Sequence, residues 1–522
     1  MRRILALIST VTFAGLVAAP LAAQQIADRG AFIMRVGADT IVIERFAWSA
    51  DTVQGQVAVK GQPRTDYVAI TGPKNTVRSM TISVFREAGS DTAPMQRAAV
   101  AIRGDSLLVD VGGHIQGFHS APGTLPLLNN SFAFAELFTR KARAAGGPVD
   151  VPAFALAGGA TLGVKVTPVG ADSMLLVIAG QEERLRVDPH GRILGGTIPA
   201  QRLEVLRVDP AAAAVLHLGR TDYSAPAGAP YTATEVTLPG PAGVLGGTLT
   251  MPAGATGPVP AVVTITGSGL QDRDEYIPVA GGYRPFRQLA DTLSRRGIAV
   301  LRLDDRTVGL SGGTPGTTAD NADDIRAAIT WLRTQRGIDG TRLALVGHSE
   351  GGVIAPMIAA TDPQLKGIVL MAGTAVTGRD VIYYQQRNAI ENDASIPAAS
   401  RETDIRAAAT ALDSLARSNA WMRFFLDYDP AMTARKVKVP VLILQGMTDH
   451  QVTPDQAGKL ATAIRSNGNA DVTVHLFPGL DHLFVPDPSG QPAGYVDLKS
   501  ARVTPTVLGM IADWLVVHMS AH

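Results

Sequence analysis

A sharp turn between an apolar strand and a helix is the feature that most constrains the fold of this chain. Residues 343–346 are apolar over the length of a strand, and residues 352–360 are mostly small and apolar, as suits a packed helix. Between them stands Gly-His-Ser-Glu-Gly, with glycines two positions before and two after Ser349. These glycines let strand and helix approach closely, so that the serine is strained and its hydroxyl exposed. The pattern predicts that Ser349 is a nucleophile.

The pentapeptide alone does not decide between a nucleophile and a purely structural turn. The chain contains 54 glycines, so a match to Gly-x-Ser-x-Gly can arise by accident. A nucleophilic serine, however, requires two partners that a structural turn does not. It predicts an acid and then a histidine, each just after a later strand, in the order Ser, Asp, His.

Both partners are present in that order. The apolar strand at 441–444 leads to Asp449, and the strand at 472–477 leads to His482. Because the carboxyl ends of parallel strands meet at one edge of a sheet, both side chains are expected near the serine. We predict that His482 takes the serine proton and that Asp449 orients its imidazole. Asp481 is the competing acid, but it directly precedes His482, so its side chain is expected to point away from the ring.

An acyl-transfer site also needs donors for the negative charge that develops on the substrate oxygen. The backbone N–H of Glu350, directly after the nucleophile, is one predicted donor. The second is expected from the loop at 267–270, which follows a buried strand, with Ser268 or Gly269 as the donor. Leu270 of the same loop is predicted to contact substrate.

The chain changes character after residue 208. From 24 to 208, short β-branched runs separated by glycine, proline and aspartate predict antiparallel strands, with one helix at 131–144. Residues 209–230 are rich in alanine, glycine and proline, which is typical of a linker. From 231 to 522 strands alternate with helices, which predicts a mainly parallel α/β sheet. In the β-rich domain, strands are expected at 40–46, 53–59, 77–85, 107–111, 174–178 and 203–208.

Five segments of the second domain resemble the α/β-hydrolase superfamily, in particular bacterial serine esterases and S33-type peptidases. They are GHSEG at 347–351, QGMTDHQV at 445–452, GLDHLF at 479–484, TGSGLQDRD at 266–274 and RLDDRTVGLSGG at 302–313. The resemblance covers a little over half of the chain. It implies an α/β-hydrolase fold with Ser349, Asp449 and His482 as the triad. The family usually has glycine where Thr307 stands.

An insertion at 374–438 is longer than a simple crossover and is predicted to form a helical cap over the strand ends. Helices are expected there at 379–391, 399–418 and 419–427. An aromatic stripe on the last helix either docks the cap or binds an acyl group, and both hypotheses stay open; its members are Trp421, Phe424, Phe425 and Tyr428. Trp421, Phe425 and His348 join the predicted substrate contacts.

Other polar residues are given structural roles. Asp304, Asp305 and Arg306 are predicted to form an ion-pair and hydrogen-bond network behind the oxyanion loop. His114 and His119 are expected to be exposed in a glycine-rich loop, because no carboxylate or second pair completes a metal-ligand set. The sequence contains no metal or nucleotide motif, so we predict neither a metal nor a cofactor.

The first 23 residues have the pattern of a secretory signal peptide. Arg2 and Arg3 precede an apolar stretch at 4–17, and small residues follow before Gln24. An uncleaved anchor is the alternative, and a lipoprotein is excluded because there is no cysteine to acylate. Without the segment, 45 basic residues face 46 acidic ones, which does not suggest nucleic acid as a partner. We predict a secreted or periplasmic protein with no membrane span after signal removal.

Together these observations predict a serine hydrolase that cleaves small-molecule carboxylic esters through an acyl-enzyme. A serine peptidase of the same fold is the first alternative, with Glu350 or acids of the cap holding a substrate ammonium. The second is a β-rich domain that binds lipid or glycan, with a secondary hydrolase activity. Acyl specificity, ester against amide preference and oligomeric state stay open, because one scaffold hosts all these chemistries.

Overall fold

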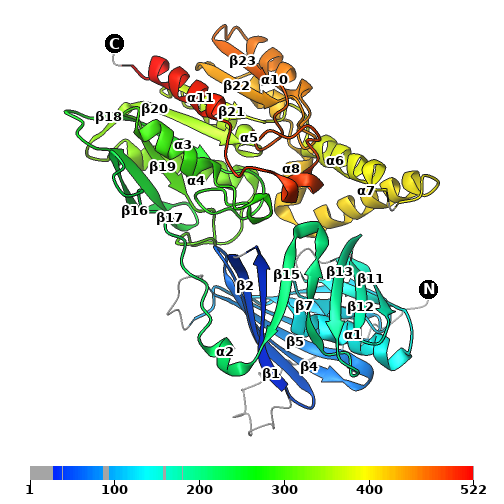
Figure 1. Cartoon of the computed structure of the whole chain (residues 1–522). Helices are drawn as coiled ribbons and strands as arrows, with labels where there is room; N and C mark the ends of the chain where they lie inside the picture. Colours follow the sequence, from blue (N-terminus) through cyan, green and yellow to red (C-terminus); the bar gives the residue numbers. More distant parts are fainter. Residues whose placement is uncertain are drawn as a thin grey trace, which may run out of the picture.

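The computed structural model describes residues 28–37, 39–85, 93–156, 160–178, 180–394 and 396–520. The predicted signal peptide lies outside these residues. The described chain forms two sheets, one of fifteen strands and one of eight, with a cap of helices beside the second (Figure 1).

The first sheet is antiparallel except for one parallel pair, β9 with β10. Its order is β8-β7-β6-β5-β4-β3-β2-β1-β15-β14-β13-β12-β11-β10-β9. Its strands are β1 (Asp28–Val36), β2 (Asp39–Trp48), β3 (Thr52–Val59), β4 (Arg64–Gly72), β5 (Thr76–Phe85), β6 (Gln96–Arg103), β7 (Ser106–Val111), β8 (His114–His119), β9 (Leu125–Leu127), β10 (Val149–Ala155), β11 (Ala160–Val169), β12 (Ser173–Ile178), β13 (Gln181–Val187), β14 (Ile193–Ile198) and β15 (Leu203–Val208).

This sheet curls around one helix, α1 (Phe132–Ala145). The helix packs against β2 and β3 as well as β9, β10, β11 and β14, which belong to opposite halves of the strand order. The Ser131 hydroxyl caps its first turn by accepting the Phe134 N–H at 3.2 Å. Glu44 of β2 accepts the N–H groups of Phe132 and Ala133 at 2.6 and 3.0 Å, which suits a carboxylate at a helix N-terminus.

The expected strands of this domain all lie within observed strands, and the helix agrees within one residue. One placement is wrong. His114 and His119 are not in a loop but are the first and last residues of β8, where both are exposed. Within the described residues, no group of three or more histidine, cysteine, aspartate or glutamate side chains is arranged to hold a metal ion.

The predicted linker holds a short helix, α2 (Pro210–Ala214), capped by Asp209, before the second sheet begins. Three-residue 3-10 turns also occur in the β-rich domain, η1 (Pro73–Asn75) and η2 (Pro199–Gln201).

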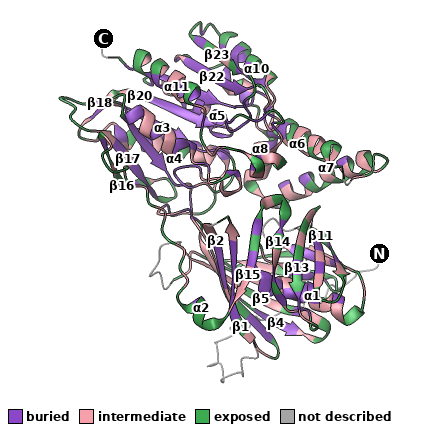
Figure 2. Ribbon diagram, viewed as in Figure 1, coloured by how far each residue is buried: buried purple, intermediate pink, exposed green. Residues whose placement is uncertain are grey.

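The second sheet is mainly parallel, as the alternation of strands and helices predicted. Its order is β16-β17-β19-β18-β20-β21-β22-β23, and only the β16 to β17 and β17 to β19 pairs are antiparallel. Its strands are β16 (Tyr231–Gly240), β17 (Gly243–Pro252), β18 (Val259–Ile265), β19 (Ala299–Leu303), β20 (Ile338–His348), β21 (Gly367–Met371), β22 (Val441–Gly446) and β23 (Val472–Phe477). The central strands are buried on both faces, which explains their continuous apolar runs (Figure 2).

Helices cover both faces of this sheet. Outside the cap they are α3 (Pro285–Ser294), α4 (Thr318–Leu332), α5 (Gly351–Ala359), α10 (Asp455–Arg465) and α11 (Pro505–His518), with 3-10 segments η3 (Pro278–Ala280) and η4 (Pro492–Asp497). The cap lies between β21 and β22 and contains α6 (Gly378–Asn392), α7 (Arg401–Ser418), α8 (Ala420–Asp427) and α9 (Pro430–Ala434). Within the described residues, no helix is long and apolar enough to span a bilayer.

Candidate active site

Ser349 occupies the sharp turn between β20 and α5. Its φ of +53° is unusual for a residue with a side chain. The turn is so tight that a Cβ on Gly347 would lie 2.1 Å from the Gly351 carbonyl oxygen. A Cβ on Gly351 would lie equally close to the carbonyl oxygen of Ile265 in β18. Only glycine fits at these two positions, so the sequence holds the serine in its strained conformation.

Asp449 and His482 meet at the ends of neighbouring strands. The Nδ1 atom of His482 lies 2.8 Å from Oδ2 of Asp449, and both side chains are buried. Asp449 also accepts the Nε2–H of Gln445 at 2.8 Å and the N–H groups of Gln451 and Val452 at 2.7 and 2.9 Å. These bonds fix the carboxylate in the orientation that meets the imidazole.

The competing acid has a different role. Oδ1 of Asp481 accepts the N–H groups of Leu483 and Val485 at 3.0 and 2.9 Å, so it shapes the loop after β23. Burial raises the pKa of this carboxyl to about 6. Within the described residues it has no hydrogen bond to the His482 ring, which is held by Asp449.

The Ser349 hydroxyl and the His482 ring make no direct hydrogen bond in the described part of the chain. Such bonds are often long before substrate binds. His348 connects the serine turn with the His482 loop instead. It directly precedes the serine, and its Nε2 lies 3.0 Å from the His482 carbonyl oxygen. The rings of the two histidines are 4.8 Å apart.

His348 is also bonded at its other nitrogen, Nδ1, which lies 2.8 Å from Oε1 of Glu275. The same oxygen accepts the Gly267 N–H at 2.9 Å. Burial lowers the pKa of His348, but the Glu275 carboxylate and the His482 carbonyl outweigh it and raise the pKa overall. The predicted substrate contact at His348 therefore needs correction, because both ring nitrogens are already bound to protein atoms.

The loop that follows β18 lies directly beside Ser349. A Cβ on Gly267 would lie 3.2 Å from the serine Cβ, so no side chain fits there. Ser268, Gly269 and Leu270 are exposed, and Gly269 has a φ of +103°. In the described residues the Glu350 N–H makes no hydrogen bond, which leaves it free for a substrate oxygen. The predicted oxyanion donors thus lie on the two segments that flank the serine.

A buried polar network stands behind this loop, in the place predicted for Asp304, Asp305 and Arg306. Asp304 bonds the Arg273 guanidinium at 2.5 Å, and Arg306 bonds Asp324 at 2.6 Å. Asp305 accepts the Thr266 hydroxyl at 3.0 Å and the Gln271 N–H at 2.9 Å. Burial raises its pKa well above the usual range.

Thr307 has a φ of +72°, the conformation that glycine adopts without cost. This explains why the family usually has glycine at the position. The neighbouring bonds of Asp305 and Arg306 hold the segment in place despite the side chain.

The cap is bonded to the serine turn through Glu350. Its Oε1 accepts the Thr318 hydroxyl at 2.6 Å and the indole N–H of Trp421 at 2.9 Å. Burial raises the pKa of Glu350, while bonds from Thr318, Trp421 and Ser268 oppose the shift. Phe425 stacks on Trp421 with ring centroids 5.3 Å apart. These contacts favour the docking role of the aromatic stripe.

The sequence did not reveal Glu275 or the Trp421 to Glu350 bond. Glu275 stands at the end of an acidic segment directly after the oxyanion loop, but nothing in that pattern selects it over Asp272 or Asp274. Its φ of +56°, set by the fold of the loop, aims it at His348.

The sheet is mainly parallel, a strained serine follows β20, and the bonded Asp–His pair follows β22 and β23. This combination defines an α/β hydrolase. Residues 280–489 match the family model described as serine aminopeptidase, S33. The C-terminal domain is accordingly an α/β hydrolase of the S33 type.

Several known proteins are similar to this chain. Esterase EstD of Thermotoga maritima is 29% identical over 288 residues, which cover 52% of this chain and 65% of the esterase. Dipeptidyl aminopeptidase BIII of Pseudoxanthomonas mexicana is 27% identical over 238 residues, covering 44% of this chain and 31% of the peptidase. The chain thus spans less than two thirds of each relative. A solved Pyrococcus furiosus esterase, PF2001, has 16% identity and a TM-score of 0.39, covering 55% of this chain and 91% of its own.

Proposed function

We propose that the protein is a serine hydrolase that cleaves carboxylic esters through an acyl-enzyme. Ser349 attacks the ester carbonyl while His482 takes its proton, and the ester C–O bond breaks as His482 protonates the leaving alcohol. Water, activated by the same histidine, then releases the acid and restores the serine. Asp449 holds the imidazole in the required tautomer and stabilises its charged form.

The observation that supports this proposal most is the 2.8 Å contact between Asp449 and His482, at strand ends beside a serine with a φ of +53°. The unbonded Glu350 N–H is the first oxyanion donor that we propose, and an N–H of Ser268 or Gly269 is the second. These donors would stabilise the tetrahedral intermediate.

A peptidase is the second candidate, because the matching family model is that of a serine aminopeptidase and one relative is a dipeptidyl aminopeptidase. An enzyme that trims N-termini needs an acid to hold the substrate ammonium. Glu350 is buried and bonded to Thr318 and Trp421, so its carboxylate is not free for that role. The cap acids Asp413 and Asp427 are paired with Arg379. The bonds of Glu350 favour the ester hypothesis.

A substrate panel tests the proposal. Turnover of p-nitrophenyl esters from acetate to palmitate is compared with turnover of aminoacyl-nitroanilides, for the natural protein and for Ser349→Ala. The exposed serine variant Ser466→Ala is the matched control. We expect ester turnover that falls by at least about a thousandfold in Ser349→Ala only. Turnover of anilides alone would favour the peptidase, and ester turnover that survives in Ser349→Ala would exclude the mechanism.

We also propose that the chain is exported, because two arginines, an apolar stretch and small residues precede Gln24. N-terminal sequencing of the mature protein from a periplasmic or culture fraction would test this. A mature protein that still begins at Met1 would contradict it.

A further inference from the structure

A cavity of about 460 Å³ lies in the β-rich domain, between α1 and the inner face of the curled sheet. Its volume falls in the range of small-molecule sites, about 300–1,000 Å³. Twelve of its eighteen lining residues are apolar, among them Met34, Leu127, Phe132, Phe138, Leu176 and Leu203. A chamber of this kind favours an apolar chain over water.

One part of the wall is polar but carries no basic side chain. Asn129, Asn130, Gln181 and Gln201 supply amides, and Glu183 supplies the one acid of the lining. Burial raises the pKa of Glu183 to about 7. No ion pair of Glu183 is formed within the described residues. A lining without a cation does not suit an anionic head group, whereas the amides suit a neutral carbonyl or ether oxygen.

The cavity reaches one edge of the sheet. Ala155, Ile178 and Ile198 line it and are the last residues of β10, β12 and β14. Gln181 and Leu203 also line it and are the first residues of β13 and β15. Because these neighbouring strands are antiparallel, all five positions lie at the same edge.

That edge faces the hydrolase domain (Figure 1). Between Gln201 and Leu203, Arg202 is ion-paired with Asp497 of η4. At the same edge, two strands further along the sheet, the Tyr276 hydroxyl donates to Asp39, the first residue of β2, at 3.0 Å.

Both contacts lie next to the machinery around Ser349. Tyr276 directly follows Glu275, which bonds the oxyanion loop through Gly267. In η4, the Tyr495 hydroxyl accepts the side-chain N–H of Gln451, whose backbone N–H is donated to Asp449. The edge that holds the cavity therefore contacts the segment that follows the oxyanion loop, at Tyr276, and the η4 segment, which is bonded to the Asp449 loop.

We propose that this cavity binds the apolar chain of the substrate, a neutral ester of a medium- or long-chain fatty acid or alcohol, whose ester group is presented to Ser349. The inference rests on the proposed ester hydrolysis and adds the substrate class and a role for the β-rich domain. The apolar chain of the substrate fills the space beside α1, and the amide side chains of the wall bind neutral oxygen atoms of the substrate.

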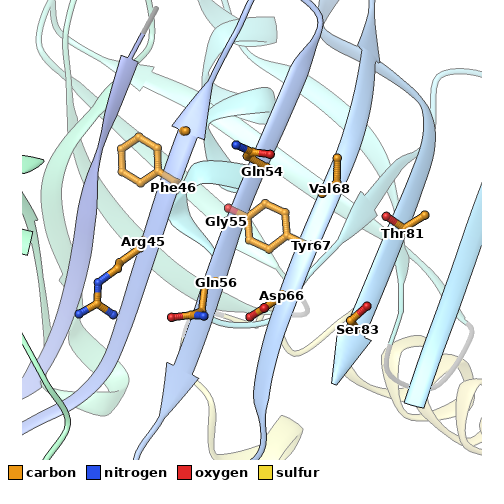
Figure 3. A pocket seen from close by; sticks show the side chains of 11 residues that line it. Arg45, Phe46, Gln54, Gly55, Gln56, Asp66, Tyr67, Val68, Thr81 and Ser83 are labelled. Atoms are coloured by element: carbon orange, nitrogen blue, oxygen red, sulfur yellow. The ribbon is translucent and has the colours of Figure 1, made fainter. Parts of the chain in front are cut away.

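The other large hollow of this domain does not fit an apolar chain. It lies open on β2 to β5, and Arg45, Gln54, Gln56, Asp66, Thr81 and Ser83 are among its lining residues (Figure 3). The choice between the two follows from the greater openness of this hollow to solvent and from the charged side chain of Arg45 in its wall.

Filling the cavity tests the proposal. Ala135 of α1 lines it, and Ala144 of the same helix is exposed, so Ala135→Phe and Ala144→Phe are matched changes. The ratio of kcat/KM for p-nitrophenyl laurate to that for the acetate is measured in both. We expect the ratio to fall at least tenfold in Ala135→Phe and to stay unchanged in Ala144→Phe. An unchanged ratio in a folded Ala135→Phe protein would overturn the proposal.

A binding measurement keeps the test independent of turnover. In Ser349→Ala, the neutral dye Nile red is bound and then displaced by methyl laurate. We expect displacement that Ala155→Phe weakens at least tenfold, and this second variant also serves if Ala135→Phe does not fold. Absence of dye displacement, or displacement that is unchanged in both blocking variants, would overturn the proposal that the cavity binds the apolar chain. If the protein hydrolyses no ester, acetate included, but methyl laurate displaces the dye as expected, the result contradicts the proposed function alone.

Discussion

The Nδ1 atom of His348 lies 2.8 Å from Oε1 of Glu275, and both side chains are buried. The other ring nitrogen faces the carbonyl oxygen of His482 at 3.0 Å. Two acceptors on one imidazole require two ring N–H groups, so this geometry fits a protonated His348 beside a charged Glu275. Burial lowers the pKa of His348, but the Glu275 carboxylate raises it, and the overall shift is upward. This raised pKa agrees with a protonated ring.

Glu275→Gln should impair catalysis more than binding. The change removes the charge that keeps His348 protonated and weakens the anchor of Gly267 in the oxyanion loop. The loss of a charged hydrogen bond, about 1.5–3 kcal/mol, corresponds to a kcat lowered about ten- to a hundredfold, with KM changed little. Steady-state kinetics on p-nitrophenyl butyrate measure the split, and the exposed Glu391→Gln of the cap is the control. A rise in KM at constant kcat would contradict the positioning role.

Asp449→Asn and Asp481→Asn should differ by orders of magnitude. Asparagine at 449 presents an amide to the Nδ1 of His482 and loses the tautomer control, so kcat should fall by about three to four powers of ten. Asp481 bonds backbone N–H groups in its own loop, and its variant should stay within about tenfold. Equal losses in the two variants, with unfolding midpoints like those of the natural protein, would show that the acid is misassigned.

Trp421→Phe should loosen the cap. The variant keeps an aromatic ring for Phe425 but removes the indole donor to the buried Glu350, at a cost of about 1 kcal/mol. We expect faster limited proteolysis of the cap at 374–438 and a higher KM for esters. The control is Phe424→Leu, at a position not bonded to Glu350. Equal proteolysis rates in the two variants would contradict the idea that the Trp421 hydrogen bond holds the cap in place.

Glu183→Gln should remove a pH dependence of stability. The folded-state pKa of about 7 lies above the ordinary value of 4.5, so the folded protein binds the proton more tightly than the unfolded chain. The stabilisation is therefore complete below about pH 4.5 and is lost as pH rises towards 7. It amounts to at most about 3.5 kcal/mol, because one pKa unit is worth about 1.4 kcal/mol.

The measurement is urea unfolding at pH 5 and pH 8, with the exposed Glu204→Gln as control. The natural protein and the control should lose more stability between these values than Glu183→Gln does. The same loss in all three would show that Glu183 does not titrate in this window.

The alternation of strands and helices could be predicted from the sequence because apolar periodicity acts within one element. The strands β1, β4, β6, β9, β10, β11, β13 and β14 were not singled out, since glycine, proline or charged residues interrupt their apolar patterns. His114 and His119 were assigned to a loop for a related reason: β8 is almost entirely exposed, and an exposed edge strand carries little apolar signal.

The sequence by itself determined the tight turn at Ser349, because the steric limit that Gly347 relieves acts over four residues; the limit that Gly351 relieves comes from Ile265 of the neighbouring β18 and depends on the tertiary structure. The sequence also determined the order of serine, acid and histidine along the chain. The tertiary structure decided that Asp449, rather than Asp481, faces His482, and that Glu275 faces His348. Those partners come from separate loops, and their pairing depends on how the packed sheet brings the loop ends together and removes them from water.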